Sequence, residues 1–314
     1  MRRRETGILI GLLILSVALW IASPYFATVA NLRNVAEQSA TIGVIAIGMT
    51  FVILSGGIDL SVGSVVALCC VAMAMAITRG VPVAVAMAFG VLVGVASGAI
   101  NGALITFGRL PPFIATLGMM SVARGGALML SDGRPISGFP DALRAVAVNN
   151  VVGVPLPVVI MLALYLVAHV VLTRTVLGRY TYAIGGNELA SAMSGVNVFA
   201  YKILVYAIAG ASAAVCAMLL MARLNSAQPI AGIGYELDAI AAVVIGGTSL
   251  LGGQGSVVGT LLGTLIMSVL RNGLNLLGVS SYVQQVAIGV VIVIAVLVDM
   301  TLHRRTQRPT TFST

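Results

Sequence analysis

Apolar runs of about 17–25 residues recur along the whole chain, the length that a helix needs to cross the hydrocarbon core of a bilayer. Only 8% of the 314 residues are charged, whereas a soluble domain carries about 25%. The 36 glycines suit this environment, because small residues let membrane helices approach closely. The sequence therefore predicts an all-α polytopic membrane protein with a single transmembrane domain over residues 1–314.

The sequence contains ten candidate crossings. The eighth is short and ends in glycines, which indicates a broken or re-entrant helix. The first follows three arginines and resembles a signal peptide, but we interpret it as an uncleaved helix because so many crossings follow it. The expected crossings are residues 7–27, 38–55, 62–78, 81–106, 113–131, 155–172, 201–222, 239–251, 257–271 and 283–300.

The distribution of Lys and Arg among the connecting loops favours a cytoplasmic location for both termini. With the N-terminus inside, ten basic residues are cytoplasmic and six are not. The cytoplasmic residues are Arg2, Arg3, Arg4, Arg109, Arg174, Arg179, Lys202, Arg304, Arg305 and Arg308. The residues on the other side are Arg33, Arg79, Arg134, Arg144, Arg223 and Arg271.

Two of the crossings carry a glycine at every fourth position. The rows are Gly90, Gly94, Gly98 and Gly102 in one crossing, and Gly255, Gly259 and Gly263 in the other. Four-residue spacing places each row on one face of a helix, and plain helix packing explains such a row. Because the rows fall in the fourth and ninth crossings, an inverted internal repeat is a second hypothesis, with substrate handled at the repeat interface.

Missing motifs exclude several classes of function. The single lysine, Lys202, is not part of the G-x-x-x-x-G-K-[ST] loop that binds ATP phosphates. The absence of G-x-S-x-G and H-E-x-x-H motifs argues against an enzyme. The net charge of +8 comes from arginines at the ends of apolar runs, so it indicates topology and not nucleic-acid binding. The three cysteines lack metal-ligand spacing, and we expect neither a metal nor a cofactor in this chain.

Five ionisable residues lie within or beside the apolar runs: Asp59, Arg124, His169, Glu236 and Asp238. A proton-coupled carrier would need such residues as a relay. A carboxylate at a helix start also satisfies free backbone N–H groups, and we favour this structural role for Asp59 and Asp238. Arg124, near the centre of the fifth crossing, is expected to contact a carbonyl cluster or a carboxylate such as Asp59.

The stretch Thr173–Lys202 is the one expected cytoplasmic connection long enough to build a structure outside the bilayer. Asn187 can cap a helix there, and Glu188 would lie in its first turn, where the helix dipole favours an acid. We predict a short helix from about Glu188 to Ser194 that ends at Gly195. Its apolar face would carry Leu189, Ala192 and Met193. Two turns of helix are unstable alone, so the membrane surface or a docked protein must hold it, unless the segment is a solvated loop.

Four segments make the chain similar to a known family. They are GIDLSVGS (57–64), LGRYTYAIGGNELASAMSGV (177–196), SAQPIAGIGYELDAIAAVVIGGTSLLGG (226–253) and NGLNLLGVSSY (272–282). With them the chain resembles the permease subunits of ribose-type ABC sugar importers, which include xylose, arabinose and galactose permeases. The resemblance implies a homodimer in the cell inner membrane, together with cytoplasmic ABC ATPase subunits that bind ATP and Mg²⁺ and a periplasmic sugar-binding protein.

The resemblance also implies a function and site residues. We expect the membrane-spanning subunit of an ATP-driven importer of a monosaccharide, ribose or a related sugar. An importer of another small solute and a self-sufficient proton-coupled carrier are the alternatives. Residues 173–200 would be the coupling segment, with ATPase contacts at Gly186, Asn187, Glu188, Leu189, Ala190, Met193, Ser194 and Gly195. Polar residues near the broken spans would line the pathway or join helices: Asp59, Ser61, Asn101, Arg124, Gln228, Asn272 and Asn275.

Overall fold

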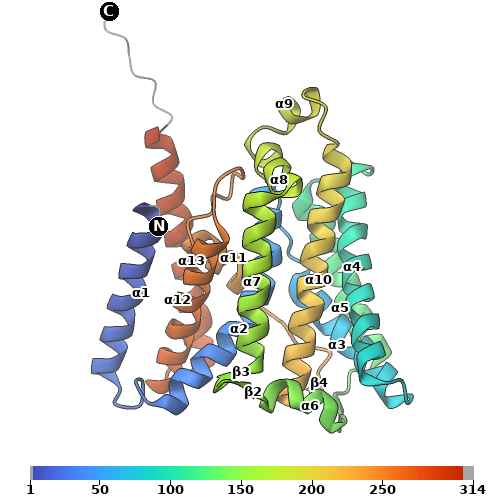
Figure 1. Ribbon diagram of the computed structural model, residues 1–314, viewed down its shortest axis with the longest axis vertical. Helices are drawn as coiled ribbons and strands as arrows, with labels where there is room; N and C mark the ends of the chain where they lie inside the picture. The colour runs from blue at the N-terminus through green and yellow to red at the C-terminus, as the bar shows by residue number, and fades with distance from the viewer. Residues whose placement is uncertain (1–2, 307–314) are drawn as a thin grey trace, which may run out of the picture.

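Each of the ten predicted crossings contains one helix in the computed structural model, which describes residues 3–306 (Figure 1). The chain is an all-α polytopic membrane protein, as predicted. Arg2 and Arg308, which were counted in the topology prediction, lie outside the described residues. The helices are α1 (Arg3–Ala22), α2 (Val29–Leu54), α3 (Val62–Thr78), α4 (Val83–Thr106), α5 (Pro112–Leu130), α7 (Leu156–Arg174), α10 (Val198–Leu224), α11 (Tyr235–Ile245), α12 (Val257–Leu276) and α13 (Ser281–Thr306).

Seven of these helices are long and apolar enough to cross a membrane: α1, α2, α4, α5, α7, α10 and α12. α3 and the apolar part of α13, Ser281–Ile294, are shorter. α11 has 11 residues and is about 16 Å long, roughly half of a hydrocarbon core of about 30 Å. That all ten helices cross the membrane completely therefore stays a prediction.

Several predicted boundaries were wrong by four or more residues, and those of α11 and α2 show why. The eighth crossing was expected at residues 239–251, but α11 begins at Tyr235 and ends at Ile245. The helix stops there because Gly247 adopts a φ of 80°, which leaves the helical conformation. α2 begins at Val29 rather than at residue 38, because the side chain of Thr28 caps it and accepts a hydrogen bond from Asn31 N at 3.3 Å.

α2 and α10 form the centre of the bundle. α2 packs against α7, α10, α11 and α12, and α10 packs against α2, α3 and α4. Nearly all of α2 from Ser39 to Leu54 is buried, whereas α1 and α4 expose large apolar side chains on their outer faces. The hydropathy agrees with this arrangement, because the outer helices α1 and α4 are more apolar than the buried α2.

The glycine rows pack helices together, as the simpler hypothesis predicted. A Cβ atom added at Gly94 or Gly98 would collide with the backbone of α10. Gly259 and Gly263 meet the backbone at the end of α11 in the same way. Gly255 precedes α12 and does not belong to the helical row, which corrects the sequence assignment.

The two rows do not support the inverted repeat, because the row on α4 faces α10 whereas the row on α12 faces α11. The contacts between helices nevertheless recur along the chain. The pairs α3–α4, α3–α5, α3–α10 and α4–α10 have as counterparts α11–α12, α11–α13, α11–α2 and α12–α2. α2 and α10 also pack against each other, as the central pair of such a repeat would. α1 and α7 lie outside this pattern.

Short elements that the apolar runs did not predict occupy the two ends of the bundle. α8 (Val176–Gly186) and α9 (Glu188–Met193) lie at one end, and α6 (Asp141–Val148) lies at the other (Figure 1). β1 (Ile136–Ser137) pairs antiparallel with β4 (Ser226–Ala227), and β2 (Asn150–Val151) with β3 (Val154–Pro155). The start of α1 and the end of α13 lie toward the α9 end (Figure 1).

Candidate functional site

α9 begins where the sequence predicted, because Asn187 caps it. The side-chain oxygen of Asn187 accepts a hydrogen bond from Ala190 N at 2.9 Å. Glu188, in the first turn, accepts a hydrogen bond of 2.6 Å from Nζ of Lys202 on α10. Gly195 has a φ of 83° and ends the helix. The short helix is therefore fixed at both ends and tied to α10.

The apolar side chains of α9 point away from the membrane-spanning helices. Leu189 is 72% exposed and Met193 is 82% exposed. The opposite side carries Ser191, which is buried and donates a hydrogen bond to Asn187 O at 2.8 Å. Figure 1 shows α9 at the tip of the bundle, beyond the end of α7. This position favours a docked protein over the membrane surface.

The sequence analysis missed α8, which connects α7 to α9. The side chain of Thr175 accepts a hydrogen bond from Gly178 N at 3.4 Å and caps the helix. Gly178, Thr181 and Ile184 recur at three-residue spacing and are buried, so α8 lies with one face on the bundle. Both signals were present in the sequence, but the glycines of this stretch made it resemble a loop.

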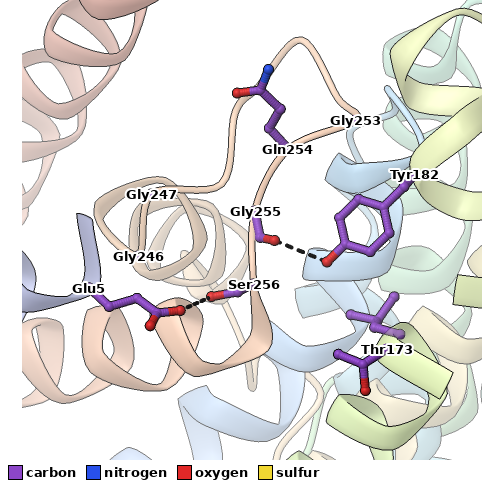
Figure 2. Close-up of a pocket in the computed structure, with 10 residues that line it drawn as sticks. Glu5, Thr173, Tyr182, Gly246, Gly247, Gly253, Gln254, Gly255 and Ser256 are labelled. Atoms are coloured by element: carbon purple, nitrogen blue, oxygen red, sulfur yellow. Dashed lines mark hydrogen bonds between the residues drawn. The ribbon is translucent and has the colours of Figure 1, made fainter. Parts of the chain in front are cut away.

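A pocket of about 840 Å³ opens beside α8 at the same end of the bundle (Figure 2). One wall is the glycine-rich loop between α11 and α12. The hydroxyl of Tyr182 donates to Gly255 O at 3.0 Å, and Ser256 Oγ donates to Glu5 Oε1 at 2.9 Å. The loop is therefore tied to both α8 and α1. The lining residues are Glu5, Leu172, Thr173, Tyr182, Gly246, Gly247, Gly253, Gln254, Gly255 and Ser256.

Asp59, Ser61 and Asn101 come together at the start of α3. The backbone N and the hydroxyl of Ser61 donate to Asp59 Oδ1 at 2.8 and 2.6 Å. Asn101 Nδ2, on α4, donates to Ser61 Oγ at 2.9 Å. All three side chains are buried. The carboxylate satisfies a free N–H at a helix start, the structural role that the sequence favoured for it.

Arg124 on α5 holds the non-helical segment that precedes α11. Its Nη1 donates to Pro229 O and to Ala231 O, both at 2.8 Å. The expected carbonyl cluster is thereby confirmed as the partner of Arg124. Gln228 begins this segment, and its carbonyl accepts a hydrogen bond from Ala231 N at 3.0 Å. Irregular backbone at membrane depth needs partners of this kind.

Asn272 and Asn275 join α12 to other helices. Asn272 and Asn31 of α2 exchange two hydrogen bonds of 2.9 Å. Gln284 of α13 donates to Asn275 Oδ1 at 2.7 Å. The seven predicted pathway residues therefore make different contacts: Asp59, Ser61 and Asn101 bond to one another, Arg124 holds the segment that Gln228 begins, and Asn272 and Asn275 bond to two different helices.

The ion pair of Asp238 and Arg271 was not predicted. Nη2 of Arg271 lies 2.7 Å from both carboxylate oxygens and joins α11 to α12. The side chain of Asp238 is 2% exposed and that of Arg271 is 35% exposed. Gln38, Arg223 and Tyr235 lie around the same pocket of about 200 Å³. Arg271 was expected at the end of the crossing 257–271, on the side opposite the cytoplasm, and no local pattern relates it to Asp238.

The chain matches the family model for the permease component of branched-chain amino acid transport systems over residues 31–296. It is 49% identical over 299 residues to the ribose import permease protein RbsC of Escherichia coli, covering 94% of this chain and 93% of that protein. RbsC of Bacillus subtilis is 48% identical over 298 residues, covering 94% and 92%. The L-arabinose transport system permease protein AraH of Escherichia coli is 36% identical over 295 residues, covering 94% and 90%. No solved structure matches the chain significantly.

Proposed function

The chain belongs to the permease family of branched-chain amino acid transport systems, and we propose that it is the membrane-spanning subunit of an ATP-driven ABC importer for a monosaccharide. Ribose is the first substrate to test, because the ribose permeases of three species are 45–49% identical to the chain. The permeases named for D-allose and L-arabinose are 40% and 36% identical. Another small solute is the alternative, since the family is described by branched-chain amino acids.

The observation that carries the proposal is the exposed apolar face of α9. Leu189 and Met193 lie on a capped helix at the tip of the bundle, where water would surround them. An exposed apolar surface on a fixed element marks a docking site, and a short helix fits a groove in a partner. We assign the partner as the ABC ATPase, which binds the ATP and Mg²⁺ that this chain has no loop to bind. The α9 end, with both termini, is then cytoplasmic.

A second copy of the chain would complete the transport pathway. The exposed residues of α4 are all apolar, as expected of a helix that faces lipid. α5 and α13 instead expose Ser121 and Gln285, and the non-helical segment before α11 exposes Ile230 and Ile233. Polar side chains and irregular backbone at membrane depth face protein or water rather than lipid. These features support a homodimer with the pathway between its copies.

In this proposal, closure of the ATPases around ATP draws the two α9 helices together, and the dimer changes the side to which it opens. The periplasmic sugar-binding protein delivers the sugar to the outer opening, so the permease need not bind it tightly. The movement is a rigid-body rearrangement of packed helices, because close-packed interfaces switch between discrete arrangements.

The test is purification of the tagged chain from native membranes in mild detergent, with every stoichiometric partner identified. Recovery of an ABC ATPase and a sugar-binding protein is the expected result, and the sugar carried by the second names the substrate. The double variant Leu189→Glu, Met193→Glu should recover about 30-fold less ATPase, as for the loss of a binding hot spot. Val152→Glu is the matched control, because Val152 is 99% exposed at the opposite end of the bundle.

Recovery of the chain alone, repeated after crosslinking, would contradict the proposal. Sugar uptake by the purified chain in liposomes without ATP would then support a self-sufficient carrier. Asp59 and Asp238 would be the residues to replace next.

A further inference from the structure

Three glycine pairs, from three of the segments singled out in the sequence, meet at the α9 end of the bundle. They are Gly56-Gly57 after α2, Gly185-Gly186 at the end of α8, and Gly252-Gly253 in the loop between α11 and α12. Gly253 N donates a hydrogen bond to Leu54 O, at the end of α2, at 2.9 Å. We use the term glycine junction for the contact of Leu54, Gly56, Gly185, Gly252 and Gly253.

Backbone packs directly on backbone in the glycine junction. A Cβ atom added at Gly185 would collide with Leu54 O and lie 2.6 Å from Gly253 N. A Cβ atom added at Gly252 would lie 2.8 Å from Gly185 O and 2.9 Å from Gly56 N. Gly252 and Gly253 also have φ values of 85° and 70°, which side chains disfavour. Both space and backbone conformation therefore require glycine in the loop.

The glycine junction connects α9 to the non-helical segment before α3 and to the loop between α11 and α12. Gly185 lies two positions before Asn187, the cap of α9. On one side, Leu54 and Gly56 lead to Asp59 and the start of α3. On the other side, the loop joins α11 to α12, and Tyr182 of α8 donates a hydrogen bond to Gly255 O in that loop. A displacement of α8 and α9 therefore reaches α3, α11 and α12 through the main-chain contacts of the junction and through the hydrogen bond of Tyr182.

We propose that Gly185, Gly252 and Gly253 are positioning residues through which movement of α9 drives the rearrangement of the membrane helices. This inference rests on the proposed function, because it needs an ATPase at α9. Close-packed backbone transmits a displacement, whereas side chains of adjustable rotamer would absorb part of it. A variant with a loosened glycine junction should still hydrolyse ATP. The hydrolysis should then no longer rearrange the membrane helices.

The test measures radiolabelled ribose taken up per ATP hydrolysed by the complete transporter in proteoliposomes, assembled from the chain and its co-purified partners. In Gly185→Ala, this ratio should fall about tenfold, which corresponds to about 1.4 kcal/mol. The amount of bound ATPase and the hydrolysis rate should stay close to the unmodified chain. Gly11→Ala on α1 is the matched control, because a Cβ atom there meets nothing within 4 Å.

Tyr182→Phe keeps the shape of the side chain and removes the hydroxyl that bonds Gly255, so it tests the same path if Gly185→Ala does not fold. The ratio should fall about fivefold, as for the loss of one hydrogen bond. An unchanged ratio in an intact complex would overturn the inference. A parallel fall of hydrolysis and uptake would make the junction purely structural and overturn it too. If the unmodified chain holds no ATPase, the proposed function fails, and the inference fails with it.

Discussion

Asn31 and Asn272 lie 241 positions apart in the chain, yet each donates a hydrogen bond to the other in the membrane part of the bundle. Arg124 in the same way holds two carbonyls of a distant segment. Polar side chains in a bilayer join helices because lipid offers them no partners. At the scale of residues, we therefore expect that replacing these polar side chains lowers the stability of the protein more than it alters which sugar is transported.

The pair of Asp238 and Arg271 allows this expectation to be measured. Asp238→Asn should lower the free energy of unfolding by about 2 kcal/mol, between the values for exposed and buried pairs, because it leaves the partly buried guanidinium without its carboxylate. Adding Arg271→Gln should restore part of this loss. Thermal unfolding of the single and double variants in detergent gives the coupling energy, and additive effects would contradict the pairing.

The same double variant separates the importer from the carrier. If Asp238 only holds α11 against α12, the stable double variant should still take up ribose with its partners at a rate within about threefold of the unmodified chain. A proton-carrying Asp238 would leave the double variant stable and inactive.

At the scale of elements, α9 shows which features of a helix can be predicted from residues adjacent in the sequence. Its cap at Asn187, its acid at Glu188 and its end at Gly195 act within two turns, so they could be predicted from adjacent residues. α8 was missed although Thr175 caps it, because glycines lower helix propensity and its stability comes from packing on the bundle. The outward direction of Leu189 and Met193 likewise depends on where the rest of the chain lies.

Asn187→Ala should destabilise α9 by about 1 kcal/mol, because the cap of Ala190 N is lost. Asn187→Asp should keep the helix, since aspartate caps as well as asparagine does. Hydrogen exchange over residues 188–193 measures the effect, and recovery of the ATPase should fall in the same order. Equal exchange in the two variants would show that α9 does not depend on its cap.

At the scale of the whole molecule, the helix contacts place two short helices, α3 and α11, beside each other. The backbones of Gly63 and Gly232 touch where these elements begin. α5 and α13 flank them through contacts with α3 and α11. The polar residues that α5 and α13 expose therefore lie on helices that flank α3 and α11. For this reason we expect the second copy on this side.

Cysteine crosslinking tests that surface. Ser121→Cys and Gln285→Cys together should give a crosslinked dimer in native membranes under mild oxidation, because a two-fold interface brings one residue of one copy against a different residue of the other. The native cysteines, Cys69, Cys70 and Cys216, are buried and so should contribute little background. Leu92→Cys, on the apolar outer face of α4, is the control and should stay monomeric. A dimer with Leu92→Cys alone would move the interface to α4.

Local sequence patterns predicted the class of the protein, the approximate place of its apolar helices and the bounds of α9. These features depend on hydropathy, caps and glycines within a stretch of about 20 residues, and such information is local. The pairing of Arg271 with Asp238 and the meeting of three glycine pairs at the α9 end of the bundle could be seen only in the tertiary structure. These features depend on residues far apart in the chain, and their approach is set by how whole helices pack.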